Sequence, residues 1–334
     1  GLKKENILSP LSQVPATTRS RTSAKKKAAY LAATLGTVGS VAAAGVVMTA
    51  YRSIGSQDKP ATIPLAQLQE NSVEALDFEG KQLVGLDGIV LASALRENAS
   101  VTVLKVSNCS MSTAAAEAFG DMLSENTTLQ TLDVSGNSFG KPAVGDQVKL
   151  KSSGEMKVVT HTYGDGDIKV EGGSGYVKPS EFEWESQFPA FCAGLKCNSA
   201  LESLDASKNG LGPAGGQVLA EVLRTNSVLT VLKVIGNSLG LEGGKAIAAV
   251  LETNETLEEV HAGNLVVGCT VRLKSSGEEK IVISKAGDGD IKVEGGSSWI
   301  KPSEFDTIPA VLPAKQLREN TIETLDLSNK GLGV

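Results

Sequence analysis

One apolar pattern returns seven times in this chain, and most neighbouring copies lie 28 residues apart. The pattern is an anchor residue with apolar residues three positions before it, two after it and seven after it. Its seven anchors are Leu76, Leu104, Leu132, Leu204, Leu232, Val260 and Leu325. Two steps between anchors are longer, at 72 and 65 residues, which equal 28 plus 44 and 28 plus 37. A fixed period indicates stacked supersecondary units, none of which buries its apolar face alone.

Each copy predicts a short strand followed by a helix. Alternating apolar residues around the anchor suit a strand that faces a shared core. Later in the copy, residues 88–98, 215–226 and 243–254 carry apolar residues three and four apart and end in Asn, which is typical of a helix and its end. Five positions after the anchor stand Cys109, Asn137, Asn209 and Asn237. We expect these side chains to bond the backbone where it leaves each strand.

The segments LQTLDVSGNSFG (129–140) and LTVLKVIGNSLG (229–240) resemble the leucine-rich repeat, in the long-period subclass similar to ribonuclease inhibitor. The resemblance covers about residues 63–334, apart from two insertions. It implies an α/β solenoid with a parallel sheet on its concave face and helices on its convex face. Lys81, Leu265 and Lys330 depart from the Asn or Cys position, and Leu265 directly precedes an insertion, so the turn of that copy is not fixed by the resemblance.

The two insertions are copies of each other. Residues 148–182 and 271–305 align without gaps at an offset of 123, with 25 of 35 positions identical. Short alternating runs split by Ser-Gly and Asp-Gly turns predict a small antiparallel β unit in each, over 144–183 and 268–306. Each unit resembles a minimal SH3-like or Tudor-like barrel. Tyr176 and Trp299 occupy the same place in the two copies, either as core or rim aromatics or as contacts to a partner.

Residues 28–51 contain no charged side chain, between Lys25–Lys27 and Arg52. Because a bilayer core is crossed by about 20 apolar helical residues, we expect a transmembrane helix here, after a basic tail (1–27) and before a linker (52–62). The rival interpretation is a signal peptide. Small residues at Gly36, Ser40 and Ala44 would let a neighbouring helix pack closely.

Charge divides the chain at this segment. The tail carries seven Lys or Arg and one Glu, whereas the remainder carries 25 basic and 37 acidic residues. The basic flank predicts a tail in the stroma or matrix and a solenoid in the lumen or intermembrane space. Lys25–Lys27 before a mild apolar run resembles lumenal export segments, which favours the thylakoid over the mitochondrial inner membrane.

The sequence gives no case for an enzyme, a cofactor or a metal. The histidines His161 and His261 stand in unrelated segments, and the Asp-Gly pairs of the insertions lack the ligand count of a calcium loop. We instead expect partner contacts on the outward side of the strands, where acidic charge disfavours nucleic acid. The residues expected there are Asp77, Lys105, Asp133, Asp205, Lys233, Glu258 and Asp326.

These features predict a non-catalytic scaffold subunit of a large organellar membrane complex, photosynthetic or respiratory, with protein subunits and membrane lipid as partners. The alternative is a membrane-anchored recognition receptor of the secretory pathway. Four N-x-S/T sequons, at Asn98, Asn108, Asn126 and Asn254, would then carry sugars. Three of these residues also close a predicted helix, so their presence needs no glycan.

Overall fold

The structure, a computed structural model, describes residues 62–83, 87–163, 166–263, 270–286, 290–308, 310–312 and 314–319. All of these residues belong to one compact unit, which spans Pro60–Val334. The predicted basic tail and residues 28–51 lie outside the described residues, and Gly36, Ser40 and Ala44 lie outside them too. The same holds for the seventh anchor, Leu325, and for Asp326.

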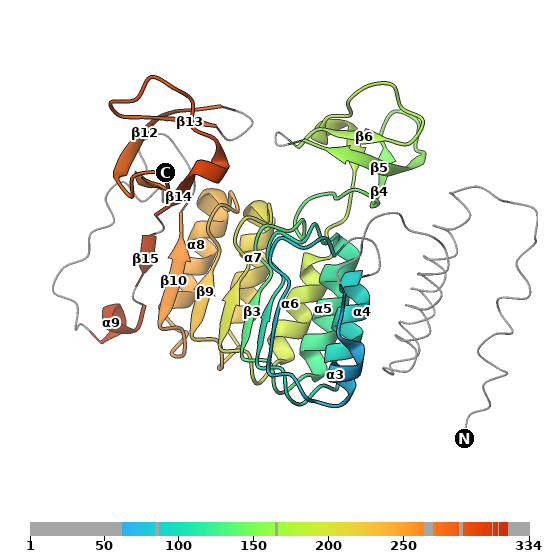
Figure 1. Cartoon of the computed structure of the whole chain (residues 1–334), viewed down its shortest axis with the longest axis vertical. Helices are drawn as coiled ribbons and strands as arrows, with labels where there is room; N and C mark the ends of the chain where they lie inside the picture. The colour runs from blue at the N-terminus through green and yellow to red at the C-terminus, as the bar shows by residue number, and fades with distance from the viewer. Residues whose placement is uncertain are drawn as a thin grey trace, which may run out of the picture. The chain divides into compact units, whose positions relative to one another are not determined.

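Six short parallel strands form the larger part of one sheet (Figure 1). They are β1 (Ala75–Asp77), β2 (Val103–Lys105), β3 (Thr131–Asp133), β8 (Ser203–Asp205), β9 (Val231–Lys233) and β10 (Glu259–Ala262). Their register places each anchor directly beside the next, from Leu76 to Val260, as the 28-residue period predicts. These six anchors are at most 7% exposed, so the sheet buries one apolar row.

Helices connect successive strands and lie beside one another (Figure 1). They are α3 (Leu65–Gln69), α4 (Asp87–Leu95), α5 (Thr113–Glu125), α6 (Phe188–Cys197), α7 (Gly212–Leu223) and α8 (Gly240–Leu251). Glycine lets two of these neighbours approach closely. A Cβ atom on Gly120 of α5 would lie 2.4 Å from the carbonyl oxygen of Ala190, and one on Gly194 of α6 would collide with Gly120. The pair α5 and α6 therefore packs backbone against backbone.

Buried asparagines link each strand turn to the preceding repeat. The Asn137 amide donates to the carbonyls of Val106 and Val134, both at 2.8 Å, and its oxygen accepts from the amides of Cys109 and Met111. Asn209 and Asn237 make corresponding bonds. The Asn position of the repeat is thus occupied by a side chain that satisfies buried backbone groups.

A second row of asparagines does the same at the helix ends. Asn126 donates to the carbonyls of Leu95 and Asn98 in the preceding repeat, and its oxygen accepts from the amides of Thr128 and Leu129. The row continues at Asn98, Asn198, Asn226 and Asn254. All five residues of the row are buried.

The sheet ends differently from the repeat pattern. The strand beside β10 is β15 (Ala310–Leu312), which runs antiparallel and sets Leu312 opposite Val260. The sequence had predicted a helix after the second insertion and a parallel strand at Leu325 further on. The chain enters β15 and then the short helix α9 (Ala314–Arg318), so an antiparallel strand pairs with the edge of β10, and the strand predicted at Leu325 lies outside the described residues.

Each insertion forms its own four-stranded antiparallel sheet, which we name insert 1 (144–183) and insert 2 (268–306). Insert 1 has the strand order β6-β5-β4-β7, and insert 2 has β13-β12-β11-β14. The strands of insert 1 are β4 (Gln147–Leu150), β5 (Met156–Thr162), β6 (Ile168–Val170) and β7 (Phe182–Glu183). Those of insert 2 are β11 (Thr270–Leu273), β12 (Glu279–Lys285), β13 (Ile291–Val293) and β14 (Phe305–Thr307). In each insert a short 3-10 helix, Pro179–Glu181 or Pro302–Glu304, precedes the last strand.

The two inserts bury matching apolar clusters. Insert 1 buries Val148, Val159, Ile168, Val170 and Phe182. Insert 2 buries Val271, Val282, Ile291, Val293 and Phe305, and each of these stands 123 residues after its counterpart. The inserts therefore have private cores, as their aligned sequences predict. Their likeness to SH3-like or Tudor-like barrels stays a prediction.

The predicted membrane architecture is wrong for the part of the chain that the structure describes. None of its helices is long and apolar enough to cross a bilayer. The longest, α5, has 13 residues, whereas a spanning helix needs about 20. This finding contradicts the fold with a transmembrane helix and the localisation as a single-pass protein of a thylakoid or mitochondrial membrane. The segment on which that prediction rested, 28–51, lies outside the described residues.

Candidate functional site

The outward face of the parallel sheet includes a row of side chains to which each strand contributes one residue. The row consists of the residues that directly follow the anchors, namely Asp77, Lys105, Asp133, Asp205, Lys233 and His261. Strand pairing puts successive members side by side, at the usual strand spacing of about 4.8 Å. Every member is exposed or half-buried, so the row, which we name the face row, is accessible.

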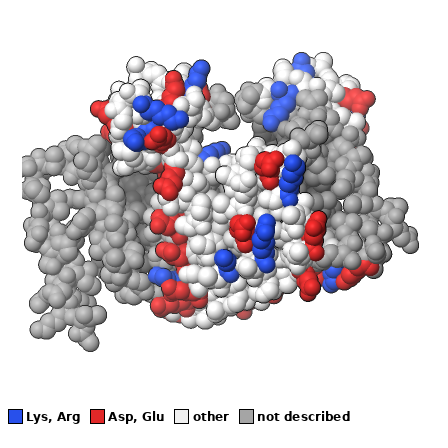
Figure 2. All heavy atoms as spheres, turned by 180° about the vertical axis from the view of Figure 1, so that it is seen from behind, with Lys and Arg blue, Asp and Glu red and all other residues white. Residues whose placement is uncertain are grey.

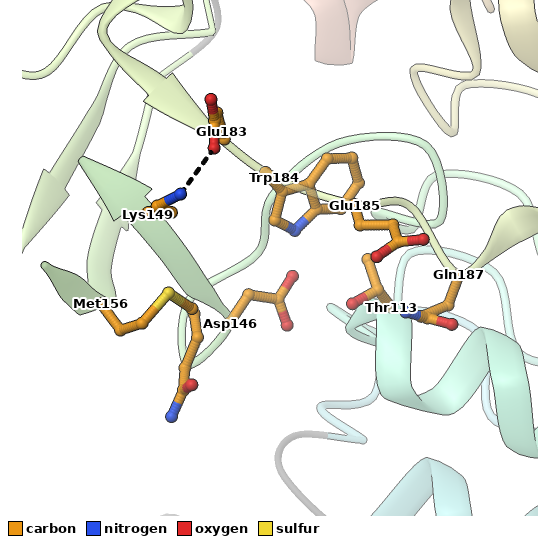
Figure 3. A pocket seen from close by; sticks show the side chains of 9 residues that line it. Thr113, Asp146, Lys149, Met156, Glu183, Trp184, Glu185 and Gln187 are labelled. Atoms are coloured by element: carbon orange, nitrogen blue, oxygen red, sulfur yellow. Dashed lines mark ion pairs between the residues drawn. The ribbon is translucent and has the colours of Figure 1, made fainter. Parts of the chain in front are cut away.

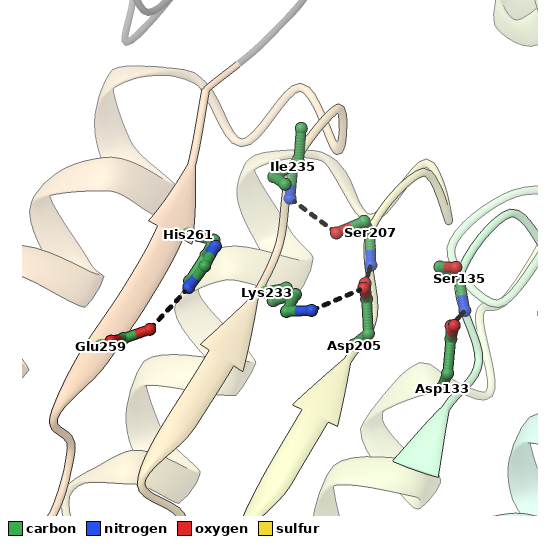
Figure 4. A network of polar contacts seen from close by, with 8 residues as sticks. All are labelled: Asp133, Ser135, Asp205, Ser207, Lys233, Ile235, Glu259 and His261. Atoms are coloured by element: carbon green, nitrogen blue, oxygen red, sulfur yellow. Dashed lines mark hydrogen bonds and ion pairs between the residues drawn. The ribbon is translucent and has the colours of Figure 1, made fainter. Parts of the chain in front are cut away.

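Both lysines of the face row pair with the aspartate one repeat earlier. The Lys105 ammonium lies 3.8 Å from the carboxylate of Asp77, and Lys233 lies 3.8 Å from Asp205 (Figure 4). Exposed ion pairs of this kind contribute little to stability. Their effect is to neutralise the two basic interruptions, which leaves Asp133 to set the sign of the row.

The aspartates of the face row also have a local structural task. The carboxylates of Asp77, Asp133 and Asp205 accept the backbone amide two residues ahead, at 2.9 to 3.0 Å. Figure 4 shows this bond at Asp133 and Asp205. Such bonds favour the turn in which a strand ends. Aspartate at this place is therefore explained by the turn, and only its remaining oxygen is offered outward.

The structure corrects one predicted member of the face row. Glu258 precedes β10, two positions before its anchor, and its carboxylate accepts a hydrogen bond from Lys315 at 2.8 Å. The residues of β10 on the row's side are Glu259 and His261, which lie 3.0 Å apart between Nε2 and the carboxylate (Figure 4). Counting one residue on from Val260 would have found His261, but sequence reasoning treated it as an isolated histidine.

Exposed aromatic rings mark equivalent places on the two inserts. Tyr176 is 61% exposed and Trp299 is 47% exposed, so neither is a core residue. The Lys169 ammonium lies 4.9 Å from the centre of the Tyr176 ring, and Lys292 lies 4.8 Å from that of Trp299. These are cation–π contacts at the rim of each insert. Sequence reasoning found the rings but missed their lysines, which the 123-residue offset aligns.

Insert 1 supports its ring with further aromatic side chains. Tyr163 lies edge-on to Tyr176 with ring centres 5.0 Å apart, and His161 lies 4.7 Å from Tyr163. A side-chain hydrogen bond with Tyr163 is the first cause that raises the pKa of Lys169. Insert 2 has Ser284 and Ala286 at the places of His161 and Tyr163, so the ring of Trp299 lacks this support.

Two of the three described cysteines are buried, and the third, Cys197, is exposed. Burial raises the pKa of Cys109 to about 11 and raises that of Cys192 further, whereas a reactive cysteine needs a lowered pKa. No group of three or more His, Cys, Asp or Glu side chains within the described ranges is arranged to hold a metal ion. The aspartates Asp165 and Asp288 lie outside those ranges.

Three of the four sequons use an asparagine of the helix-end row. Asn98, Asn126 and Asn254 are at most 6% exposed, and each amide nitrogen donates to carbonyls of the preceding repeat. A sugar on that nitrogen would have to break these bonds. Asn108 is exposed, so three of the four sequon asparagines are explained by the fold and not by a glycan.

Charge is mixed over the surface of the molecule. Figure 2 shows acidic and basic side chains interspersed over one face, several of them side by side. Exposed ion pairs within single elements include Glu221 with Arg224 and Glu242 with Lys245. The chain as a whole carries a net charge of −6, which does not favour a polyanion as partner.

Two segments of the repeat region match a family model in sequence. The family model described as Leucine Rich repeat matches residues 125–144 and 225–248, which include the segments that carried the resemblance. A comparison with curated protein sequences finds no match.

Two solved structures are similar to parts of the chain at low identity. One is the C-terminal domain of tropomodulin from Caenorhabditis elegans, at 11% identity and a TM-score of 0.38, covering 57% of this chain and 90% of that one. The other is actin-binding site 2 of leiomodin-1, at 15% identity and a TM-score of 0.31, covering 61% of this chain and 80% of that one.

Proposed function

We propose that this chain is a non-catalytic scaffold that binds partner proteins through the face row and through the exposed rings of the two inserts. The single observation that carries the proposal is the face row itself, with one accessible polar side chain per strand at fixed spacing. A rigid sheet that offers many side chains at fixed positions suits an extended protein surface.

Acidic charge selects the kind of partner. Asp77 and Asp205 neutralise the two lysines, so Asp133 gives the face row its net negative charge. A protein surface with exposed basic side chains complements this charge, whereas a nucleic acid backbone does not. An accessory subunit of a multi-subunit protein assembly is the role that these surfaces fit.

The test compares charge reversals on two faces of the full-length chain. Lys105→Glu with Lys233→Glu places like charges beside Asp77 and Asp205 on the sheet face, where like charges in contact repel. The matched control is Lys245→Glu on α8, whose lysine also pairs with an acidic neighbour, Glu242. Each tagged chain is used for affinity capture, and the captured proteins are quantified by mass spectrometry.

We expect the sheet-face variant to change the set or amount of captured proteins and the α8 variant to resemble the original chain. Circular dichroism and the melting temperature check that both variants remain folded. If both variants capture the same proteins in the same amounts as the original chain, the sheet face is not the binding surface.

A further inference from the structure

One carboxylate joins insert 1 to the helix layer. Asp146 stands just before β4, and its carboxylate accepts the backbone amide of Ala143 at 2.8 Å. The hydroxyl of Thr113, the first residue of α5, donates to the same carboxylate, and so does the indole of Trp184, directly after β7. Figure 3 shows these side chains together at the base of the insert. Asp146 thus connects the entry of the insert, its exit and a helix.

The surroundings of this joint are partly closed to water. Thr113 is 6% exposed, and the ring of Trp184 packs against the buried cluster of insert 1. Burial raises the pKa of Asp146, while the hydrogen bonds from Ala143, Thr113 and Trp184 act against that rise. Through these hydrogen bonds the carboxylate joins three segments of the chain.

Insert 2 lacks the three side chains of this arrangement. The 123-residue offset places Cys269 where insert 1 has Asp146, and Thr307 where it has Trp184. In α8, Leu241 stands at the position that Thr113 has in α5, nine residues after the anchor. Leu241 is 57% exposed, whereas Thr113 is buried. The start of α8, in the repeat before the one that carries insert 2, therefore exposes the residue at the position of Thr113.

We propose that Asp146 is a latch that holds insert 1 in one orientation on the helix layer, whereas insert 2 lacks the three side chains of such a latch. The latched insert presents Tyr176 from a fixed place, and no equivalent latch fixes the place of Trp299. This consequence for partners rests on the proposed function, whereas the latch itself does not. A fixed contact loses less conformational freedom on binding than a turning one.

Pulsed electron paramagnetic resonance on the full-length chain measures the two orientations separately. The background carries Cys197→Ser and Cys269→Ser, while Cys109 and Cys192 are buried. One label pair, Glu117→Cys with Ser174→Cys, reports insert 1 against α5. The matched pair, Lys245→Cys with Ser297→Cys, reports insert 2 against α8. The four label sites are exposed, and the second pair occupies the repeat-equivalent positions of the first.

We expect a narrow distance distribution for the first pair and a broad one for the second. Asp146→Ala and Thr113→Val should each broaden the first distribution toward the second. Glu183→Gln is the control, because Glu183 lines the same hollow as Asp146 but pairs with Lys149 inside the insert, at 3.3 Å. It should leave the first distribution narrow.

Two results would overturn the latch. One is a first distribution that is already as broad as the second in the original chain. The other is a first distribution that stays narrow in both Asp146→Ala and Thr113→Val. Thr113→Val decides the case if Asp146→Ala unfolds the insert, because Thr113 lies outside it. No partner is present in this experiment, so its outcome is independent of the proposed function.

Discussion

The two inserts have the same interior and different attachments. Their buried clusters match residue for residue, with Val148, Ile168 and Phe182 in one and Val271, Ile291 and Phe305 in the other. Insert 1, however, leads into α6, a full helix of the repeat, and is tied through Asp146 to α5. Insert 2 leads into β15 and the short α9. What differs between the copies is therefore the joint and the path of the chain after it.

This difference shows that a duplicated module keeps what its own fold requires and loses what only its position required. The apolar residues of each insert are fixed by a private core, so they are the same in both copies. The hydrogen bonds of Asp146 and Trp184 depend on Thr113 of α5 and on the path of the chain into α6. In the second copy those neighbours are absent, and the aligned residues are Cys269 and Thr307.

The largest effect is expected where insert 1 returns to the repeat. Gly194→Ala would press a methyl group onto the backbone of Gly120 and force α5 and α6 apart. We expect the free energy of unfolding to fall by about 3 kcal/mol, as in severe overpacking. Chemical denaturation measures this. The control Gly244→Ala in α8 has open space around the new methyl group and should be neutral or slightly stabilising. Equal effects of both substitutions would contradict the close packing.

The equality of the two interiors is tested by matched truncations. Ile168→Ala and Ile291→Ala should each destabilise their own insert by about 2–4 kcal/mol, because each removes most of a buried side chain. Hydrogen exchange measured by mass spectrometry should show loss of protection in the mutated insert only. If either variant also exposes the parallel sheet, the cores are not private. If one insert tolerates the change far better than the other, the inserts do not share one interior.

Comparing Asp146 with Asp87 tests how much hydrogen-bond donors reduce the cost of burying a carboxylate. Neither carboxylate oxygen of Asp87 has a hydrogen-bond partner among the described residues, and burial raises its pKa from 3.8 to about 6. The folded state therefore binds the proton more tightly than the unfolded state, so stability falls as pH rises from about 4 to 6. Removing the Asp87 carboxylate should stabilise the fold by about 2 kcal/mol at pH 7.

Asp87→Ala is the substitution for this test, because other repeats have Ala115, Gly215 and Gly243 at the same position. Between pH 4 and 7, the free energy of unfolding of Asp87→Ala should be higher than that of the original chain and should depend less on pH. Asp146→Ala should not stabilise at pH 7, since it removes hydrogen bonds together with the charge. A stability of Asp87→Ala that is unchanged at pH 7 would show that the carboxylate is hydrated.

The smallest effect is expected from moving the joint to insert 2. The triple change Leu241→Thr, Cys269→Asp and Thr307→Trp supplies the three groups that insert 1 uses. We expect it to narrow the distance distribution between labels at 245 and 297, with a gain in stability of about 1 kcal/mol for the added hydrogen bonds. The control is the double change Leu241→Thr with Thr307→Trp, which should leave the distance distribution unchanged. If the distance distribution of the triple variant stays broad, the orientation of insert 1 is fixed by its connection to α6 and not by these three side chains.

The sequence predicts the periodic parts of this molecule and misses the parts that occur once. The register from Leu76 to Val260 follows from the 28-residue period, and the two interiors follow from the 123-residue offset. β15 has no such signal, because a run of three apolar residues is too short to distinguish an edge strand from a loop. Glu258 was misplaced because acidic residues were collected by charge and not by their distance from the anchor.

The joint of insert 1 could not be predicted for a different reason. Thr113, Asp146 and Trp184 are 33 and 38 residues apart, and no shared spacing links them. Their meeting depends on how the insert folds back on the repeat. The membrane prediction came from the charge-free run 28–51 and its basic flanks, which lie outside the described residues.

The asparagine row at the helix ends makes the same contacts whether or not a repeat carries an insertion. Asn198 reaches Leu123 and Asn126 across insert 1 at 2.8 and 2.9 Å, just as Asn226 reaches Leu195 in a repeat without an insert. Lengthening one closed loop from 28 to 72 residues costs only about 0.8 kcal/mol of chain entropy. During evolution, a folded unit can therefore be inserted into a repeat, exchanged or lost while the neighbouring repeats keep their contacts.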